Sequence, residues 1–244
     1  GVPNITTADG PAGLRIQPEV GVCTTAWPCA TLLAATWDED LVFRVGAAAS
    51  AEVKENNISV WLAPAVNIHR SPLCGRNFEY DSEDPLLAGK IAAAMVRGIQ
   101  SRHIAATVKH FACNNKETNR KNSDSRLSQR ALREIYLRAF EITVREAGPW
   151  AIMSSYNIIN GHRASECREL LTGILRDEWG YTGVVMTDWW TKGEHYKEIL
   201  AGNDLKMANG YPERVRQAMN LGLLSRSDLE VCARRILELI LKID

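Results

Sequence analysis

Short apolar runs rich in β-branched residues alternate along the chain with longer stretches whose apolar residues recur at a helical period. The short runs predict seven strands: Asn4–Ala8, Ala30–Thr36, Ile58–Val66, Ala105–Cys113, Trp150–Tyr156, Gly183–Thr187 and Asn203–Met207. The longer stretches predict six helices: Asp38–Asn56, Asp84–Arg102, Ser128–Ala147, Glu166–Trp179, Glu213–Leu221 and Ser227–Ile243. Such alternation indicates a parallel sheet with crossover helices.

Two architectures fit this pattern: an open doubly wound sheet and a closed barrel. Segments such as Ala151–Met153 and Val184–Met186 are apolar at every position, as a strand covered on both faces requires. Seven units in 244 residues favour a barrel, and no G-x-G-x-x-G motif follows a strand to suggest dinucleotide binding. We therefore expect an α/β fold, a TIM-like (β/α) barrel, in a single domain over residues 1–244.

Composition and charge exclude several classes of partner. Lys plus Arg and Asp plus Glu both number 29, so the net charge is zero, and no basic stripe predicts nucleic acid or an anionic membrane surface as a partner. No apolar run is long enough to cross a bilayer. The six cysteines are scattered, which favours a reducing compartment and hence the cytoplasm. The chain begins at Gly1, so secretion or a periplasmic location after removal of a signal stays open.

Polar and aromatic side chains collect just after several predicted strands. In a parallel barrel these strand ends meet on one face and form the active site. The candidates from this pattern are Asp9, Arg76, Lys109, His110, Arg120, Tyr156, Asp188 and Trp189. Charged side chains of both signs can bind sugar hydroxyls, and a tryptophan ring can cover the C–H face of a pyranose. The histidines lack metal-ligand spacing, so we expect neither a metal nor a cofactor.

Asp188 is the candidate nucleophile among these residues. It follows an apolar strand and precedes two tryptophans, and we expect nearby cations (Lys109, Arg76 and Arg120) to hold its pKa low. Three other interpretations remain open. Asp188 could cap a helix, Lys109 could form a Schiff base as in aldolase-like barrels, and the two arginines could pair structurally with Glu79 or Asp124.

Five segments carry a resemblance to a known family. Residues 109–120, KHFACNNKETNR, resemble the K-H-F-x-x-N-N-x-E-x-x-R signature of family-3 glycoside hydrolases. The segments DGP at 9–11, GRNFE at 75–79, MSSYN at 153–157 and VMTDW at 185–189 are similar to other motifs of that family, in the same order. The resemblance covers essentially the whole chain, and five linked motifs make it specific.

The resemblance implies a retaining hydrolase that cleaves terminal β-D-glucosides, such as short cello-oligosaccharides, through a glycosyl-enzyme intermediate. By this resemblance Asp188 is the nucleophile, Tyr156 lies beside it, and Trp189 forms an aromatic wall. The remaining matches are the residues that hold the sugar hydroxyls: Asp9, Arg76, Lys109, His110 and Arg120. A β-xylosidase of the same family is the nearest alternative, and a homo-oligomer is compatible with the sequence.

The departures from the family pattern concern the acid/base. A retaining glycosidase needs a second carboxyl group about 5–5.5 Å from the first. In β-glucosidase-like members it is usually a glutamate on a separate α/β sandwich domain, which this chain does not contain. Glu79, Glu117 and Asp81 are weaker candidates, and Asn114 and Asn115 stand where the N-acetylglucosaminidase branch has glycine and histidine. We therefore expect either a fragment of a larger enzyme or a non-catalytic sugar-binding barrel.

Overall fold

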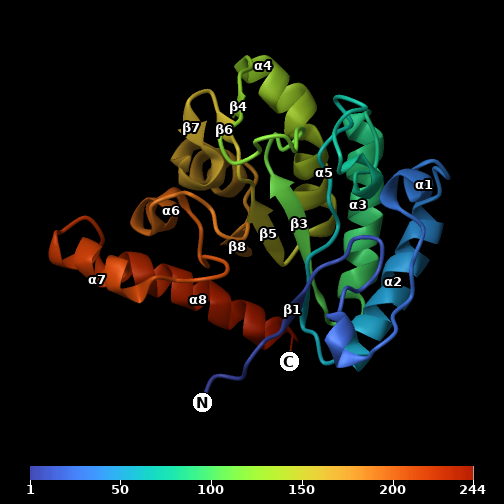
Figure 1. The fold of residues 1–244 in the computed structure, drawn as a ribbon, viewed down its shortest axis with the longest axis horizontal. Helices are drawn as coiled ribbons and strands as arrows, with labels where there is room; N and C mark the ends of the chain where they lie inside the picture. Colours follow the sequence, from blue (N-terminus) through green and yellow to red (C-terminus); the bar gives the residue numbers. More distant parts are fainter. Residues whose placement is uncertain (244) are drawn as a thin grey trace.

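A parallel five-stranded sheet forms the centre of the molecule in the computed structural model, which describes residues 1–243 (Figure 1). The strands lie in chain order and all pair in parallel. They are β1 (Thr7–Ala8), β2 (Val60–Trp61), β3 (Ala105–Phe111), β5 (Ala151–Ser154) and β8 (Val184–Thr187). Beyond β8, Leu205 makes one isolated parallel bridge to Met186. Five of the predicted strands are thus confirmed, and Asn203–Met207 contributes a single bridge.

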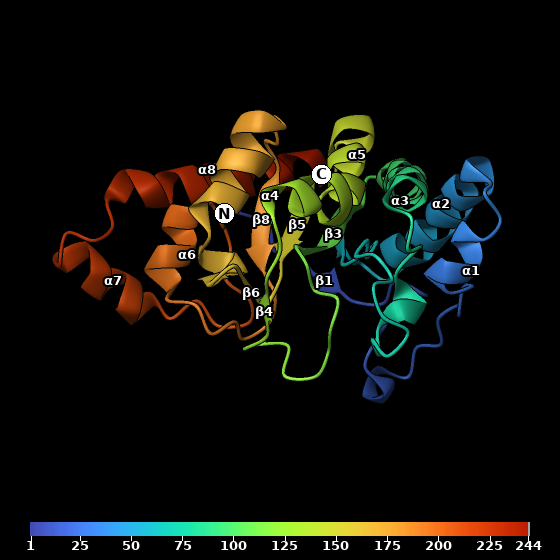
Figure 2. The ribbon, with the colours of Figure 1, turned by 90° about the horizontal axis from the view of Figure 1, so that it is seen from above.

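The sheet curls into a half-barrel, so the prediction of a TIM-like barrel is confirmed only as an α/β fold with a curved parallel sheet (Figure 2). Within residues 1–243 no pairing joins β1 to the opposite edge at Leu205. The helix α8 (Arg226–Ile243) provides the physical reason. Its Leu239 belongs to the same buried cluster as strand residues such as Val60 and Val184, so a helix covers part of the concave face that a closed barrel would enclose with strands.

The opposite, convex face of the sheet is covered by helices that the sequence predicted. Alternate strand residues, including Trp61, Val108 and Val185, belong to a larger core cluster shared with these helices. Besides α1 (Ala30–Ala34) and α8, the helices are α2 (Glu39–Glu55), α3 (Pro85–Gln100), α4 (Gln129–Ala131), α5 (Arg138–Ala147), α6 (His195–Ala201) and α7 (Pro212–Asn220), with π-helical η3 (Leu132–Tyr136) and η5 (Glu169–Glu178). Of these, α6 was not predicted. Asp38 and Asp84 cap α2 and α3 through their carboxylates, which fixes where both helices begin.

The predicted strand Ala30–Thr36 is wrong, because Ala30–Ala34 forms helix α1. The amide of Leu33 donates to the carbonyl of Cys29, and only one side of the segment is buried, at Leu33 and Ala34. Alanine and leucine favour a helix, and so short an apolar run does not distinguish the two structures by its pattern.

Small elements complete the fold. Three short strands make a second sheet, β4 (Asp124–Ser125), β6 (Ile158–Ile159) and β7 (His162–Arg163), which the sequence did not predict. Single 3₁₀ turns are η1 (Pro18–Val20), η2 (Asn77–Glu79) and η4 (Ala164–Glu166). In the described part of the chain, no helix combines the length and apolar character needed to cross a bilayer.

Candidate active site

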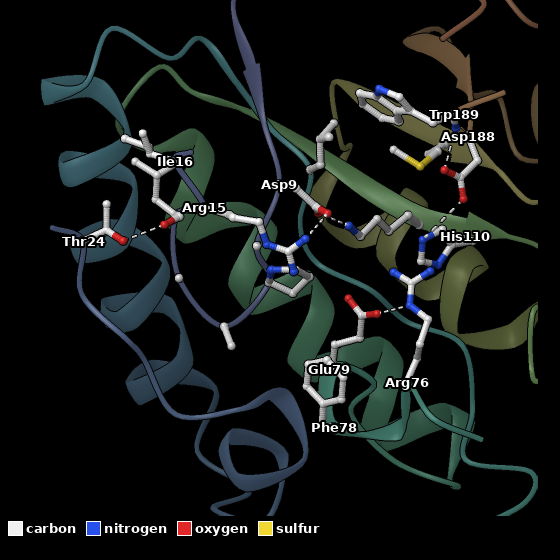
Figure 3. Close-up of a pocket in the computed structure, with 18 of the residues that line it drawn as sticks. Asp9, Arg15, Ile16, Thr24, Arg76, Phe78, Glu79, His110, Asp188 and Trp189 are labelled. Carbon is white, nitrogen blue, oxygen red and sulfur yellow. Dashed lines mark hydrogen bonds and ion pairs between the residues drawn. The ribbon is translucent and has the colours of Figure 1, made fainter. Parts of the chain in front are cut away.

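One cavity of about 720 Å³ opens at the carboxyl ends of the parallel strands (Figure 3). All eight residues that the sequence placed in the site line it: Asp9, Arg76, Lys109, His110, Arg120, Tyr156, Asp188 and Trp189. They come from five separate segments of the chain, and the parallel sheet brings them together because each segment follows a strand on the same edge.

Asp188 follows β8 directly and has only 9% of its side chain exposed. Its Oδ1 accepts from the amide of Trp189 at 2.7 Å, whereas Oδ2 has no hydrogen-bond partner within residues 1–243. Burial raises the pKa of Asp188 above its ordinary value, and the Trp189 amide, Tyr156, Lys109 and Arg76 oppose this only in part. The predicted lowering of this pKa is therefore wrong, because the loss of hydration outweighs the attraction of the nearby cations.

Lys109 and Asp9 form an ion pair across the floor of the cavity. Lys109 lies in β3, two residues before the strand ends, on the concave side of the sheet, and is 2% exposed; its Nζ lies 2.5 Å from Oδ1 of Asp9. Burial raises the pKa of Asp9, but the charge and hydrogen bond of Lys109 outweigh it and leave that pKa lowered. The ammonium group of Lys109 is thus bonded to a carboxylate, whereas a Schiff-base lysine requires an apolar pocket, and this contact argues against a Schiff-base role.

His110 occupies the space between this pair and Asp188. The side chain of Asn67 bonds both backbone groups of His110, accepting from its amide at 2.8 Å and donating to its carbonyl at 2.9 Å. The Nε2 atom of His110 lies 3.8 Å from Oδ2 of Asp188. Burial lowers the pKa of His110 well below its usual range, and the three surrounding cations lower it further. The imidazole is therefore neutral, and its contact with Asp188 is not an ion pair.

Both arginines of the site pair with glutamates of their own loops. Arg76 contacts Glu79, as the structural alternative predicted, while Nη1 of Arg120 donates to Glu117 at 2.8 Å rather than to Asp124. These pairs fix the guanidinium groups without removing them from the cavity, which both side chains line. Structural pairing and sugar binding are thus compatible at the two positions.

An aromatic wall closes the side of the cavity next to Asp188. The hydroxyl of Tyr156 donates to the backbone carbonyl of Trp189 at 2.7 Å. The guanidinium of Arg120 lies over the Tyr156 ring, 4.6 Å from its centroid, and this cation–π contact stiffens the wall. Burial and the adjacent Asp188 carboxylate both raise the pKa of Tyr156, so the phenol stays protonated at neutral pH.

Comparison with known proteins identifies the family to which this site belongs. The family described as Glycosyl hydrolase family 3 N terminal domain matches residues 1–239. The chain belongs to glycosyl hydrolase family 3. Beta-glucosidase A of Butyrivibrio fibrisolvens is 67% identical over 230 residues, covering 94% of this chain and 28% of that protein. Exo-alpha-(1->6)-L-arabinopyranosidase of Bifidobacterium longum is 42% identical, covering 99% of this chain and 33% of that protein.

Solved structures of family 3 agree with the fold. Beta-glucosidase 3B from Thermotoga neapolitana, solved in complex with alpha-D-glucose, matches with a TM-score of 0.95 at 45% identity. The match covers 99% of this chain and 36% of that one. The chain therefore spans about a third of the length of these family-3 proteins, and its fold agrees with theirs over nearly all of its residues.

The family-3 cavity is also lined by residues that the sequence analysis did not select. They include Arg15, Ile16, Thr24 and Phe78, which Figure 3 labels, and also Trp190. Phe78 is 54% exposed and Trp190 is 58% exposed, which is unusual for rings of this size. In the sequence, Phe78 precedes Glu79 and Trp190 follows Trp189. An aromatic residue next to a candidate was therefore the signal that could have identified both. The loop containing Thr24 offered no comparable signal.

Proposed function

We propose that this chain is the nucleophile-bearing domain of a retaining glycosidase that cleaves terminal β-D-glucosides. The arrangement of Asp188 carries the proposal. One carboxylate with an uncommitted oxygen faces a cavity whose other polar groups are already paired, as in Lys109 with Asp9. Such a carboxylate is free to attack an anomeric carbon, while the paired groups hold the sugar hydroxyls in a fixed geometry.

The reaction follows from these positions. Asp188 attacks the anomeric carbon as the glycosidic oxygen leaves, and a covalent glycosyl-enzyme forms; water then displaces Asp188 with overall retention. The pKa of His110 is lowered, so its imidazole stays neutral. It can donate a hydrogen bond to a sugar hydroxyl and does not take up the proton that the catalytic acid has to deliver. Tyr156 holds the backbone beside the nucleophile through Trp189.

The acid/base that this reaction requires is proposed to lie outside the chain. Glu79 and Glu117 both belong to ion pairs with arginines of their own loops, so their carboxylates are already engaged in contacts that position Arg76 and Arg120. Asp81 is buried, and it does not line the cavity. A glutamate on a second α/β sandwich domain fits these observations, since relatives of this chain are about three times its length.

Short β-linked gluco-oligosaccharides are the proposed substrates. The high identity to a β-glucosidase supports glucose in the cleaving subsite. A relative named for a pentopyranoside, at 42% identity, supports β-xylosides as the second candidate, because such sugars lack the exocyclic CH₂OH. A non-catalytic sugar-binding barrel would retain the sugar subsite but would not cleave a glycoside. Asp188 would then stay unlabelled in the trapping experiment.

Trapping of the intermediate tests the proposal directly. The protein at its natural full length would be incubated with a 2-deoxy-2-fluoro-β-glucoside that has a dinitrophenyl leaving group, and the adduct would be mapped by mass spectrometry. We expect the label on Asp188, since this leaving group needs little acid assistance. The matching xyloside should label more slowly. A label on another residue, or none, would exclude Asp188 as the nucleophile.

A further inference from the structure

The loop after the proposed nucleophile, Trp189–Gly193, is bonded to two buried charged residues, Lys206 and Glu198, that none of the family motifs includes. The segment leading to Met207 runs beside β8, where the amide of Thr187 donates to the carbonyl of Leu205 at 2.9 Å. Farther along, the amide of Trp190 donates to the carbonyl of Met207 at 3.0 Å. The loop therefore rests on this neighbouring segment.

Lys206 lies in that segment and directs its ammonium group at the loop. Its side chain is 3% exposed, and Nζ donates to three acceptors: Oγ1 of Thr191 at 3.0 Å, the carbonyl of Gly193 at 3.1 Å and Oε2 of Glu198 at 2.5 Å. An ammonium group has three protons, so the geometry uses its full donor capacity. Two of the three bonds hold the loop itself.

Glu198, on helix α6, holds the same loop from the other side. Its Oε1 accepts from Oγ1 of Thr191 at 2.7 Å and from Oγ of Ser165 at 2.9 Å, and Glu198 is fully buried. A Cβ atom on Gly193 would overlap this oxygen, so only glycine lets the loop approach the carboxylate so closely. Thr191 is thereby bonded to both members of the pair.

Stability does not explain why a charge pair occupies this position. A buried ion pair is often no more stabilising than apolar side chains of similar volume, because both charges lose their hydration. What the pair supplies, and apolar contacts do not, is a set of directed bonds that fix the loop in one place. We propose that Lys206 and Glu198 are positioning residues that set the orientation of the Asp188 carboxylate and the Trp189 ring.

The connection to Asp188 runs through the backbone. The amide of Trp189 donates to Oδ1 of Asp188, and its carbonyl accepts from Tyr156, so a shift of the loop turns the carboxylate and the aromatic wall together. A displacement of about 1 Å at a reacting group can slow a reaction by about 100-fold. The inference rests on Asp188 being the nucleophile proposed above.

The chain offers a matched control two residues away. Asp204 forms an equally buried ion pair with Arg176, whose side chain is 7% exposed, at 2.8 Å, and its other oxygen pairs with Arg235 at 2.9 Å, so loss of Arg176 leaves Asp204 with a cationic partner. This pair bonds the amide of Val185 and the carbonyl of Gly202, both of which lie outside the Trp189–Gly193 loop. Loss of Arg176 should therefore weaken the fold without moving the nucleophile.

The experiment compares Lys206→Met/Glu198→Gln with Arg176→Met in the protein at its natural full length. The paired change avoids an unpartnered buried charge, and the amide oxygen of the introduced glutamine remains an acceptor for Thr191 and Ser165. The readouts are the rate of Asp188 labelling by the dinitrophenyl 2-fluoroglucoside, the Kd of glucose and the Tm. We expect labelling by the paired variant to slow by about 10- to 100-fold, with the Kd of glucose changed less than about threefold.

Arg176→Met should lose at least as much Tm while its labelling rate stays within about twofold of wild type. The inference is overturned if the paired variant labels at the wild-type rate, or if both variants slow in proportion to their loss of Tm. A wild-type protein that is not labelled on Asp188 is a different result, since it removes the nucleophile assignment on which the inference depends.

Discussion

Two aspartates occupy equivalent places at the ends of β1 and β8, yet their surroundings differ. Asp9 is 38% exposed and pairs with Lys109 and, at 3.6 Å, with Arg15, and its pKa is lowered. Asp188 is 9% exposed and has a single backbone donor, and its pKa is raised. Under the proposed function, the same residue type after the same kind of strand holds the substrate in one case and attacks it in the other.

The difference shows how a fold assigns roles to like groups. A carboxylate that is satisfied by a cation is stabilised in its charged form and loses nucleophilicity, whereas a poorly satisfied one keeps it at a cost in stability. The predictions below test whether the two aspartates can be separated in this way.

Asp188→Asn should give the largest effect. Without a carboxylate to attack, turnover should fall by about 10³-fold or more, which corresponds to ~4 kcal/mol of transition-state stabilisation. Glucose should still bind, because Asp9 and Lys109 remain. Steady-state kinetics and calorimetric titration with glucose measure the two quantities. A variant with a tenth of the wild-type turnover would contradict the role of Asp188.

Asp9→Asn should act mainly on binding and stability. It leaves the buried ammonium of Lys109 without its partner, which costs about 3–5 kcal/mol in a fully buried pair and about 2 kcal/mol here, because Asp9 is partly exposed. We expect KM to rise by about 30-fold, more than kcat falls, and urea unfolding to show the loss. If kcat alone fell, the assigned roles of the two aspartates would be wrong.

The stability of Asp188→Asn should change in the opposite direction. A raised folded-state pKa means that the ionised carboxylate destabilises the fold above that pKa, and this penalty disappears below the unfolded value of about 3.9. The variant should therefore gain on the order of 1 kcal/mol at pH 7 and lose the gain as the pH falls toward about 4. Thermal unfolding across this pH range measures it, with Asp9→Asn as the destabilised comparison.

The acidic limb of kcat/KM should reflect the same pKa. Because Asp188 must be ionised to attack, activity of the free enzyme should decline on the acidic side at a pH above the ordinary aspartate value of about 3.9. A limb at or below that value would show that the cations dominate after all. The profile should be recorded with an aryl glucoside whose leaving group departs without protonation, so that the acidic limb reports only the ionisation of Asp188.

Arg15→Ala should have the smallest effect. The guanidinium is 71% exposed and 3.6 Å from Asp9, so the pair contributes at most about 0.5 kcal/mol. Urea unfolding should be almost unchanged, and KM should rise less than about threefold. A loss as large as that of Asp9→Asn would mean that Arg15, rather than Lys109, holds Asp9.

The candidate site was predictable from the sequence because its residues follow strands. Asp9, Lys109 and Asp188 each follow or end an apolar run, and parallel strands bring such ends to one edge. The pKa of Asp188 was not predictable, since a sequence displays the cations of a site but not the burial that outweighs them. Lys206 and Glu198 were missed for a related reason: eight positions apart and separated by a turn, they meet only in the folded chain.

The packing of α8 also explains the position of the two ends of the half-barrel. Ile5, before β1, and Ile243, at the end of α8, pack against the same inner cluster, and Figure 1 shows the first residues and the end of α8 near the starts of the central strands. The sheet resembles a barrel that is open along one side, between β1 and Leu205. Within residues 1–243 the curvature of the sheet is therefore supported from the inside, by α8, and not by strand pairing across the opening.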